Sequence, residues 1–388
     1  NDLSGIRAAA RLEPGETPGS THVLLVVDED RRWDTALSAS NYGNRSTGRT
    51  QGSVSGSLNN LSGVGDQADL AYTLAEGMGF VRFGYRRPLG TQGWLLELGQ
   101  TALDYEVVSG AGADSAIDGD ARVSRLGLSY PLVRSRLANV TLGVEGAYEA
   151  LEDRVAGTAI SDKRVETLSL RLGADRTDRW GGGGRTDLSL VPTWGNLDLS
   201  QVADDARQDA ATFDRAGDFT KVEWRLARLQ ALGASRFTAY AELRGQFANR
   251  NLDSSQRFQV AGPGGVRAYP GGEASSDEGQ FARLELRYAI PGLAMLPGQL
   301  TLAGFYERAH VQRFHNLGAG QIDSATGRNR YHIEGAGVSL TMNQPGRFSA
   351  GVTWATTLGD NPGRSVDGNN SDGRDDDQRV WLQTELRL

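Results

Sequence analysis

Apolar and polar residues alternate along many stretches of the chain. In RVWLQTELRL (379–388), Val380, Leu382 and Leu386 fall on one face and Arg379 and Glu385 on the other. A period of two residues predicts a β-strand with one apolar and one polar face. The same alternation recurs in VTLGVEGAYEA, VETLSLRLGAD and FARLELRY, at 140–150, 165–175 and 281–288.

The pattern predicts about sixteen strands, and bacterial membrane barrels have an even number. They are expected near 33–41, 49–58, 67–75, 78–87, 94–105, 121–131, 138–150, 164–175, 185–199, 219–232, 235–247, 279–289, 299–311, 331–342, 347–358 and 378–388.

The connections between these segments alternate in length. Those after odd-numbered strands are mostly long, polar and flexible in composition: 108–120, 151–163, 201–217, 248–278, 312–330 and 359–378. Those after even-numbered strands tend to be tight: 89–93, 232–234, 291–298 and 343–347. A soluble β-sandwich shows the same alternation within its strands but has no reason to sort its loops. Long loops on one side and short turns on the other favour a sixteen-stranded antiparallel transmembrane β-barrel.

Composition agrees with this class. No run approaches the 18 or so apolar residues of a membrane helix, and the mean hydropathy is −0.43, as expected when lipid-facing and lumen-facing residues alternate. The net charge of −7 argues against nucleic acid as a partner. The chain has no cysteine, which fits an oxidising compartment.

Residues 1–30 read differently from the rest of the chain. They offer a short helix-like or strand-like piece, a Pro/Gly turn and a strand at His22–Val27. That is too little to form a domain by itself. We expect 1–30 to be the C-terminal part of a small α+β module, and 31–388 to be the barrel.

Candidate catalytic or metal-binding groups are few. The four histidines (His22, His310, His315 and His332) form no metal-binding motif, and neither a nucleophile elbow nor a phosphate loop is present. The glycine cluster WGGGGRT (180–186) lacks the lysine of a phosphate loop. The tract DGNNSDGRDDD (367–377) has the carboxylates that calcium prefers, but its glycine falls off the EF-hand spacing, so a solvated loop is favoured. We expect no cofactor, no metal and no catalysed reaction.

The loop 248–278 contains GPGGVRAYPGGEASSDEGQ, a glycine-rich run with one arginine, Arg267. Such an arginine is usually an exposed loop residue. A long ordered loop in a compact structure is usually functional, however, and an arginine folded into a charge-lined lumen needs a carboxylate partner.

This segment resembles the sixth-loop hallmark of the two-partner-secretion outer-membrane transporters, the haemolysin and filamentous-haemagglutinin exporter family of the BamA superfamily. The family pattern Val-Arg-Gly-Phe/Tyr stands here as Val266, Arg267, Ala268 and Tyr269. A second pattern, Phe/Gly-x-Asp-x-Gly, is similar to FYERA. Its matching positions are Phe305, Glu307 and Ala309, where Glu and Ala replace Asp and Gly.

The resemblance implies that Arg267, at the tip of an inward-folded loop, pairs with Glu307 on the lumen wall. It covers nearly the whole chain: residues 1–29 resemble the end of a periplasmic POTRA domain and 41–67 the first barrel hairpin. The two Gly→Ala changes leave less room for close backbone approach. The chain also departs from the family by ending in Leu388 rather than an aromatic residue.

By this resemblance the chain exports one large, β-helical exoprotein with an N-terminal secretion domain across the Gram-negative outer membrane (type Vb secretion). The POTRA domains receive the unfolded partner, and its folding outside supplies direction. The barrel would contact outer-membrane lipid, depend on the barrel-assembly machinery for insertion and act as a monomer. Alternatives are a BamA-like insertase or a patatin-type (type Vd) transporter on the same barrel, a passive porin, or a surface enzyme or adhesin.

Overall fold

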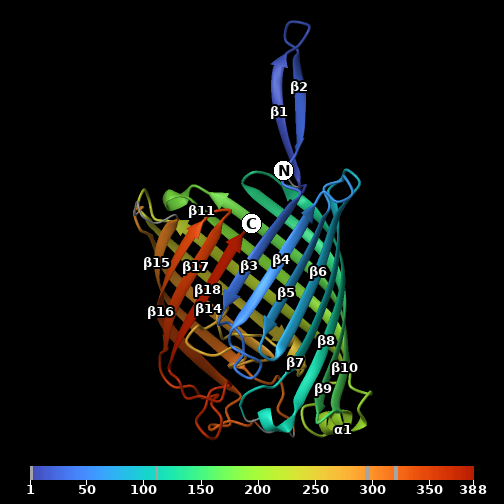
Figure 1. Cartoon of the computed structure of the whole chain (residues 1–388), viewed down its shortest axis with the longest axis vertical. Coiled ribbons are helices and arrows are strands. Elements are labelled where there is room, and N and C mark those ends of the chain that lie inside the picture. Colours follow the sequence, from blue (N-terminus) through green and yellow to red (C-terminus); the bar gives the residue numbers. More distant parts are fainter. Residues whose placement is uncertain (1–2, 111, 293–297, 319–321) are drawn as a thin grey trace.

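In a computed structural model, which describes residues 3–110, 112–292, 298–318 and 322–388, sixteen antiparallel strands form one closed barrel (Figure 1). Strands β3 to β18 follow one another around the wall in chain order, and β18 pairs with β3 to close it. Their bounds are β3 Trp33–Ser40, β4 Gln51–Asn59, β5 Gln67–Ala75, β6 Met78–Leu89, β7 Trp94–Glu106, β8 Ile117–Arg134, β9 Ala138–Val155, β10 Thr158–Asp178, β11 Gly184–Asp198, β12 Gly217–Ala231, β13 Phe237–Ala248, β14 Glu278–Ala289, β15 Gln299–Gln312, β16 Arg330–Gln344, β17 Phe348–Thr357 and β18 Gln378–Arg387.

The two faces of each strand explain why the sheet closes. On β18, Val380 and Leu382 are exposed on the outer surface, whereas Arg379 and Trp381 are buried inside. A lipid-facing surface must be apolar, and closure removes the unpaired edges that lipid cannot hydrogen-bond. Among the described helices none is long and apolar enough to span a membrane.

All sixteen strands expected from the sequence are present, but β8, β9 and β10 are each longer than expected by five residues or more. The polar segment 151–163 was expected to be a flexible loop, and that prediction is wrong. Strand β9 runs on to Val155, β10 begins at Thr158, and only 156–157 turn between them. Arg154 on β9 forms ion pairs with Asp118 and Asp120 on the neighbouring strand β8. Both faces of this segment carry polar residues, so its sequence does not alternate between apolar and polar positions. A loop is therefore predicted where the strands in fact continue.

The two rims of the barrel differ. The first residues of β3 and the C-terminus lie at one rim, and helix α1 (Ala203–Ala211), within the expected loop 201–217, lies at the other (Figure 1). The turn 343–347 is tight, as expected, since residues 345–347 join β16 to β17. The expected turn 291–298 lies mostly outside the described residues, as do 111 and 319–321 within the expected loops 108–120 and 312–330.

Residues 3–30 form a separate two-stranded hairpin rather than a piece containing a helix. Strands β1 (Ile6–Pro14) and β2 (Thr21–Glu29) pair only with each other, and nearly all of their residues are exposed. Figure 1 shows the hairpin projecting beyond the rim that carries the C-terminus. Its assignment to the end of a POTRA domain stays a proposal.

Candidate functional site: the lumenal loop and its anchors

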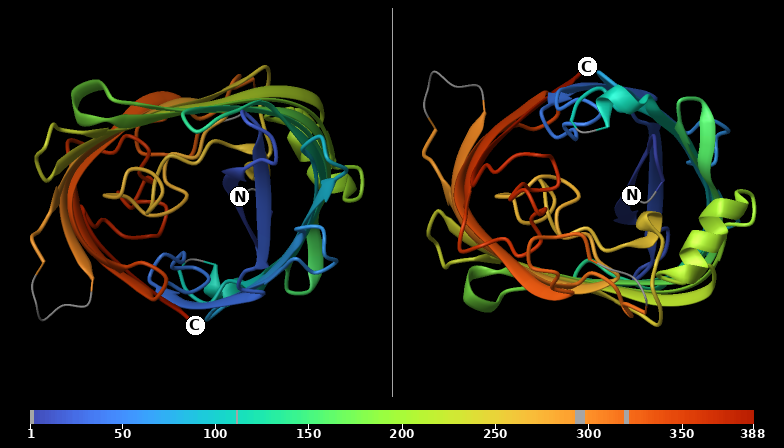
Figure 2. Two further views of the ribbon diagram at one scale, coloured as in Figure 1. Left: turned by 90° about the horizontal axis from the view of Figure 1, so that it is seen from above. Right: turned by 90° about the horizontal axis from the view of Figure 1, so that it is seen from below.

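The connection between β13 and β14, residues 249–277, folds back into the lumen (Figure 2, yellow). It is a compact unit with bridges of its own: Phe258 pairs with Ser276, and the Val266 amide donates to the carbonyl of Val260 at 2.8 Å. Gly265 is required here, because a Cβ would lie 2.1 Å from that carbonyl oxygen. The loop is therefore an ordered plug.

The tip of this loop packs into the largest buried apolar cluster of the described residues. Val266, Ala268 and Tyr269 are fully buried, and they pack with the buried residues Phe305 and Ala309 of the barrel wall. The structure thus brings the two sequence motifs together inside the lumen. Alternation along β15 places Phe305, Glu307 and Ala309 on the inner face, while Leu302 is exposed outside.

Arg267 lies against Glu307. Its Nε donates to Glu307 Oε1 at 2.8 Å, and its backbone N–H donates to Oε2 at 2.8 Å. The guanidinium also stacks on the Phe305 ring, 3.4 Å from its centroid. The Arg267 side chain is 11% exposed and that of Glu307 0%, so this ion pair is shielded from solvent.

The same carboxylate serves a second arginine that the sequence motifs do not include. Arg283 on β14 lies directly across from Glu307 in the strand pairing, and its Nε donates to Glu307 Oε1 at 2.6 Å. On its other side Arg283 faces Glu242 on β13, 3.8 Å away. Glu285 lies 3.9 Å from Arg267. Alternation had placed Arg283 and Glu285 on the polar face, but only strand register shows which residues meet.

A second contact missed from the sequence comes from the last strand. Trp381 Nε1 on β18 donates to the Arg267 carbonyl oxygen at 2.7 Å. The motif arginine is thus held by β15 through its side chain and backbone N–H, and by β18 through its backbone carbonyl. The loop tip therefore connects strands that are not neighbours in the barrel.

The replacement of glycine by alanine at position 268 is accommodated on β16, the strand next to β15. Gly335 on β16 faces the motif, and a Cβ there would lie 2.7 Å from the Ala268 Cβ and 3.2 Å from Val266 Cγ1. Because Gly335 has no side chain, the methyl group of Ala268 fits against its backbone. The expected loss of room is therefore offset by a glycine on the wall.

Two further ion pairs fix the base of the loop. Asp253 lies 3.1 Å from Lys163 on β10, and Asp277 lies 3.0 Å from Arg257. Burial would raise the pKa of Asp253, but Lys163 and the Ser255 amide outweigh burial and lower it. Burial raises the pKa of Asp277 despite Arg257.

The other candidates from the sequence form no site. In the part of the chain that the structure describes, no group of three or more His, Asp or Glu residues could hold a metal ion, and this includes 367–377. His315 pairs with Glu278 at 2.6 Å, and the glycine cluster at 180–186 forms a short 3-10 turn at Trp180–Gly182 and the first residues of β11.

Comparison with known proteins agrees with a barrel whose lumen holds an ordered loop. A family model, Haemolysin secretion/activation protein ShlB/FhaC/HecB, matches residues 19–342. The heme/hemopexin transporter protein HuxB of Haemophilus influenzae is 26% identical over 367 residues, covering 93% of this chain and 63% of HuxB. The outer membrane transporter CdiB of Dickeya dadantii (strain 3937) is 22% identical over 328 residues, covering 80% of this chain and 56% of that protein. The chain thus spans less than two thirds of these relatives.

Solved structures show the same fold. CdiB from Escherichia coli superposes with a TM-score of 0.78 at 18% identity, covering 98% of this chain and 67% of that one. BamA from Haemophilus ducreyi, lacking POTRA domains 1–3, superposes with a TM-score of 0.60 at 12% identity, covering 98% and 75%.

The barrel and its ordered lumenal loop define an outer-membrane protein of the transporter-barrel class. Within that class, the chain belongs to the ShlB/FhaC/HecB family of two-partner secretion. The sequence predictions of the barrel, the outer membrane and the family are confirmed.

Proposed function

We propose that this chain is the translocation unit that carries a large, β-helical partner exoprotein from the periplasm to the cell surface. Family membership supports transport of a secreted partner. The observation that carries the proposal is the loop 249–277, which occupies the lumen and is held there by buried ion pairs. No reaction is catalysed in this proposal.

The loop acts as a plug that must shift for a chain to pass. Removing one partner of a buried ion pair costs about 3–5 kcal/mol when the other charge is left uncompensated, and releasing Arg267 costs less than that, because Glu307 keeps its ion pair with Arg283. The anchored and released positions of the loop therefore differ by an amount that binding of a partner could supply. In the released position, the inner-face charges would line a polar path.

The proposed partners follow from this role. The exoprotein would present an N-terminal secretion domain at the rim that carries β1 and β2, which we assign to the periplasmic side and to the end of a POTRA domain. The barrel would insert through the barrel-assembly machinery, contact lipid around its outer face and work as a monomer without nucleic acid.

The test is export of the partner by cells that carry the full-length protein. Arg267→Ala should leave barrel assembly intact and reduce the partner at the cell surface. Arg308→Ala is the matched control, because Arg308 lies next to Glu307 in sequence and its side chain is half exposed. Normal export by a well-assembled Arg267→Ala variant would contradict the proposed role of the loop.

The BamA-like insertase remains the second candidate, because the BamA barrel has the same fold. It predicts that loss of the protein lowers the amounts of many outer-membrane proteins. The export proposal predicts loss of one surface protein only. Quantitative proteomics of outer membranes from a deletion strain distinguishes the two.

A further inference from the structure

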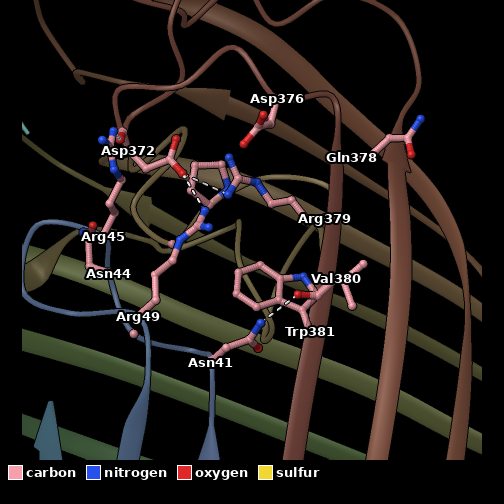
Figure 3. Close-up of a pocket in the computed structure, with 13 residues that line it drawn as sticks. Asn41, Asn44, Arg45, Arg49, Asp372, Asp376, Gln378, Arg379, Val380 and Trp381 are labelled. Carbon is pink, nitrogen blue, oxygen red and sulfur yellow. Dashed lines mark hydrogen bonds and ion pairs between the residues drawn. The ribbon is translucent and has the colours of Figure 1, made fainter.

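The seam between the first and last barrel strands contains a polar cavity. Strands β3 and β18 pair only over Ala36–Ser40 and Gln383–Arg387. Beyond that point the Asn41 side chain bonds to the backbone of β18, at Val380 and Leu382. A cavity of about 210 Å³ lies beside this stretch, on the side of the lumenal loop (Figure 3).

Three segments distant in sequence line the cavity. Residues 41–49 follow β3, Pro270 and Gly271 follow the Val266–Tyr269 motif, 372–376 precede β18, and 378–381 begin it. A molecule bound here would therefore contact the first loop, the last loop and the lumenal loop together.

The charges in the cavity are unbalanced. Arg49 Nη2 and Arg379 Nη1 lie 3.3 and 2.9 Å from the same oxygen of Asp372, Oδ2. Arg45 donates to the Asp372 carbonyl oxygen at 3.1 Å. Two guanidinium groups thus converge on one carboxylate and a third on the backbone carbonyl of the same residue, and the other lining acid, Asp376, pairs with Arg374 outside the cavity. Figure 3 shows Arg49 and Arg379 directed at Asp372.

Several polar atoms of this buried group have no partner in the described part of the chain. They are Nε and Nη2 of Arg379 and Oδ1 of Asp372, whose side chains are 5% and 3% exposed. Buried polar atoms are almost always hydrogen-bonded, and a buried arginine without enough acceptors is costly. In the wall of the cavity, two guanidinium nitrogens and one carboxylate oxygen, now covered by neighbouring atoms, become available to a ligand that displaces those neighbours.

We propose that this cavity binds a protonated phosphate group, either inorganic phosphate or a phosphate monoester. The forked donors of arginine match the oxygens of a phosphate. The free Asp372 oxygen accepts a hydrogen bond only from a ligand with a proton to donate. Monohydrogen phosphate carries such a P–OH group and sulfate does not, so the site discriminates between two anions of equal charge and similar size.

The test is equilibrium dialysis of the full-length transporter, purified in a phosphate-free neutral detergent, against radiolabelled inorganic phosphate at constant ionic strength. We expect saturable binding of one phosphate, with sulfate and acetate competing at least about tenfold more weakly. Arg379→Lys keeps the charge and removes the unpartnered donors, and it should weaken binding by about tenfold or more. Arg49→Gln should weaken binding as well.

Arg328→Gln, in the loop between β15 and β16, removes the same charge outside the cavity and should bind normally. A heat-dependent shift in gel mobility checks that each variant is folded. Nanodiscs with and without lipopolysaccharide identify the source of the phosphate. If lipopolysaccharide blocks dialysed phosphate in the wild type, the natural ligand is a lipid phosphate; if it has no effect, the ligand is free phosphate. Absence of binding, equal binding of sulfate, or equal binding by Arg379→Lys and the wild type would overturn the proposal.

Discussion

At the scale of single residues, Glu307 is the centre of the lumenal network. It accepts the Arg267 backbone amide and the side chains of both Arg267 and Arg283. Exchanging the charges of Arg267 and Glu307 would place an arginine at 307 against Arg283. We therefore expect the double exchange to restore export only in part, whereas an isolated ion pair would be restored fully.

The shared carboxylate also predicts an order among single substitutions. Arg267→Ala removes one cation and leaves Glu307 paired with Arg283. Glu307→Ala leaves two buried arginines with only their longer contacts to Glu285 and Glu242, and a fully broken buried pair costs about 3–5 kcal/mol. We expect faster hydrogen exchange of the loop amides in both variants, and a larger increase for Glu307→Ala. Arg308→Ala should exchange as the wild type does. A larger effect of Arg267→Ala would show that Arg283 does not share the carboxylate.

The contact between Gly335 and Ala268 makes a second prediction at this scale. Gly335→Ala places a methyl group 2.7 Å from the Ala268 Cβ, and such overpacking costs about 1–3 kcal/mol. Ala268→Gly alone should be nearly silent. Ala268→Gly combined with Gly335→Ala should recover most of the loss, which chemical denaturation of the folded barrel in detergent measures. Strictly additive effects in this cycle would exclude the contact as the cause.

At the scale of elements, contact with lipid imposes apolar–polar alternation only on the parts of the strands that lie within the membrane. Strands such as β15 and β18 alternate because one face meets lipid, and they were predicted to within a few residues. The outer part of the β9–β10 hairpin projects beyond that region, is polar on both faces and was missed. Pairing of Arg267 with Glu307 was expected from family resemblance. Arg283, Trp381 and Lys163 were missed, because their contacts depend on register and on how the loop enters the lumen.

The ion pair between Lys163, near the start of β10, and Asp253, in the lumenal loop, leads to a pH-dependent prediction. Because the folded-state pKa of Asp253 is lowered, the Lys163–Asp253 contact contributes stability that is full above the unfolded pKa of about 3.9 and is lost as the pH falls below it. We expect Lys163→Met to raise hydrogen exchange of residues 250–256 at pH 6. The difference from the wild type should shrink at pH 3.

The matched control is Arg207→Met on the exposed face of α1, where Arg207 pairs only with Asp204 among the described residues. It should leave residues 250–256 unchanged at both pH values. A difference between Lys163→Met and the wild type that is independent of pH would mean that packing, rather than the ion pair, holds the base of the loop.

At the scale of the whole molecule, the loop decides between an exporter and an open pore. Sixteen strands leave an aqueous channel when nothing fills it, and here the segment 249–277 lies across the lumen (Figure 2). A passive porin would have a channel that is open at rest. A plug bridging β15 and β18 argues for one that opens only when the loop is displaced.

Conductance in planar lipid bilayers tests this difference. The wild-type barrel should conduct weakly, and replacing residues 259–275 by a short Gly-Ser linker should raise conductance several-fold, since it removes the Arg267 anchor and its apolar packing while keeping the base of the loop. Arg267→Lys keeps a cation facing Glu307 and should conduct like the wild type, whereas Arg267→Ala should open intermittently. A wild-type barrel already as conductive as the linker variant would show that the loop does not block the lumen, and the porin alternative would then describe the molecule better than the exporter.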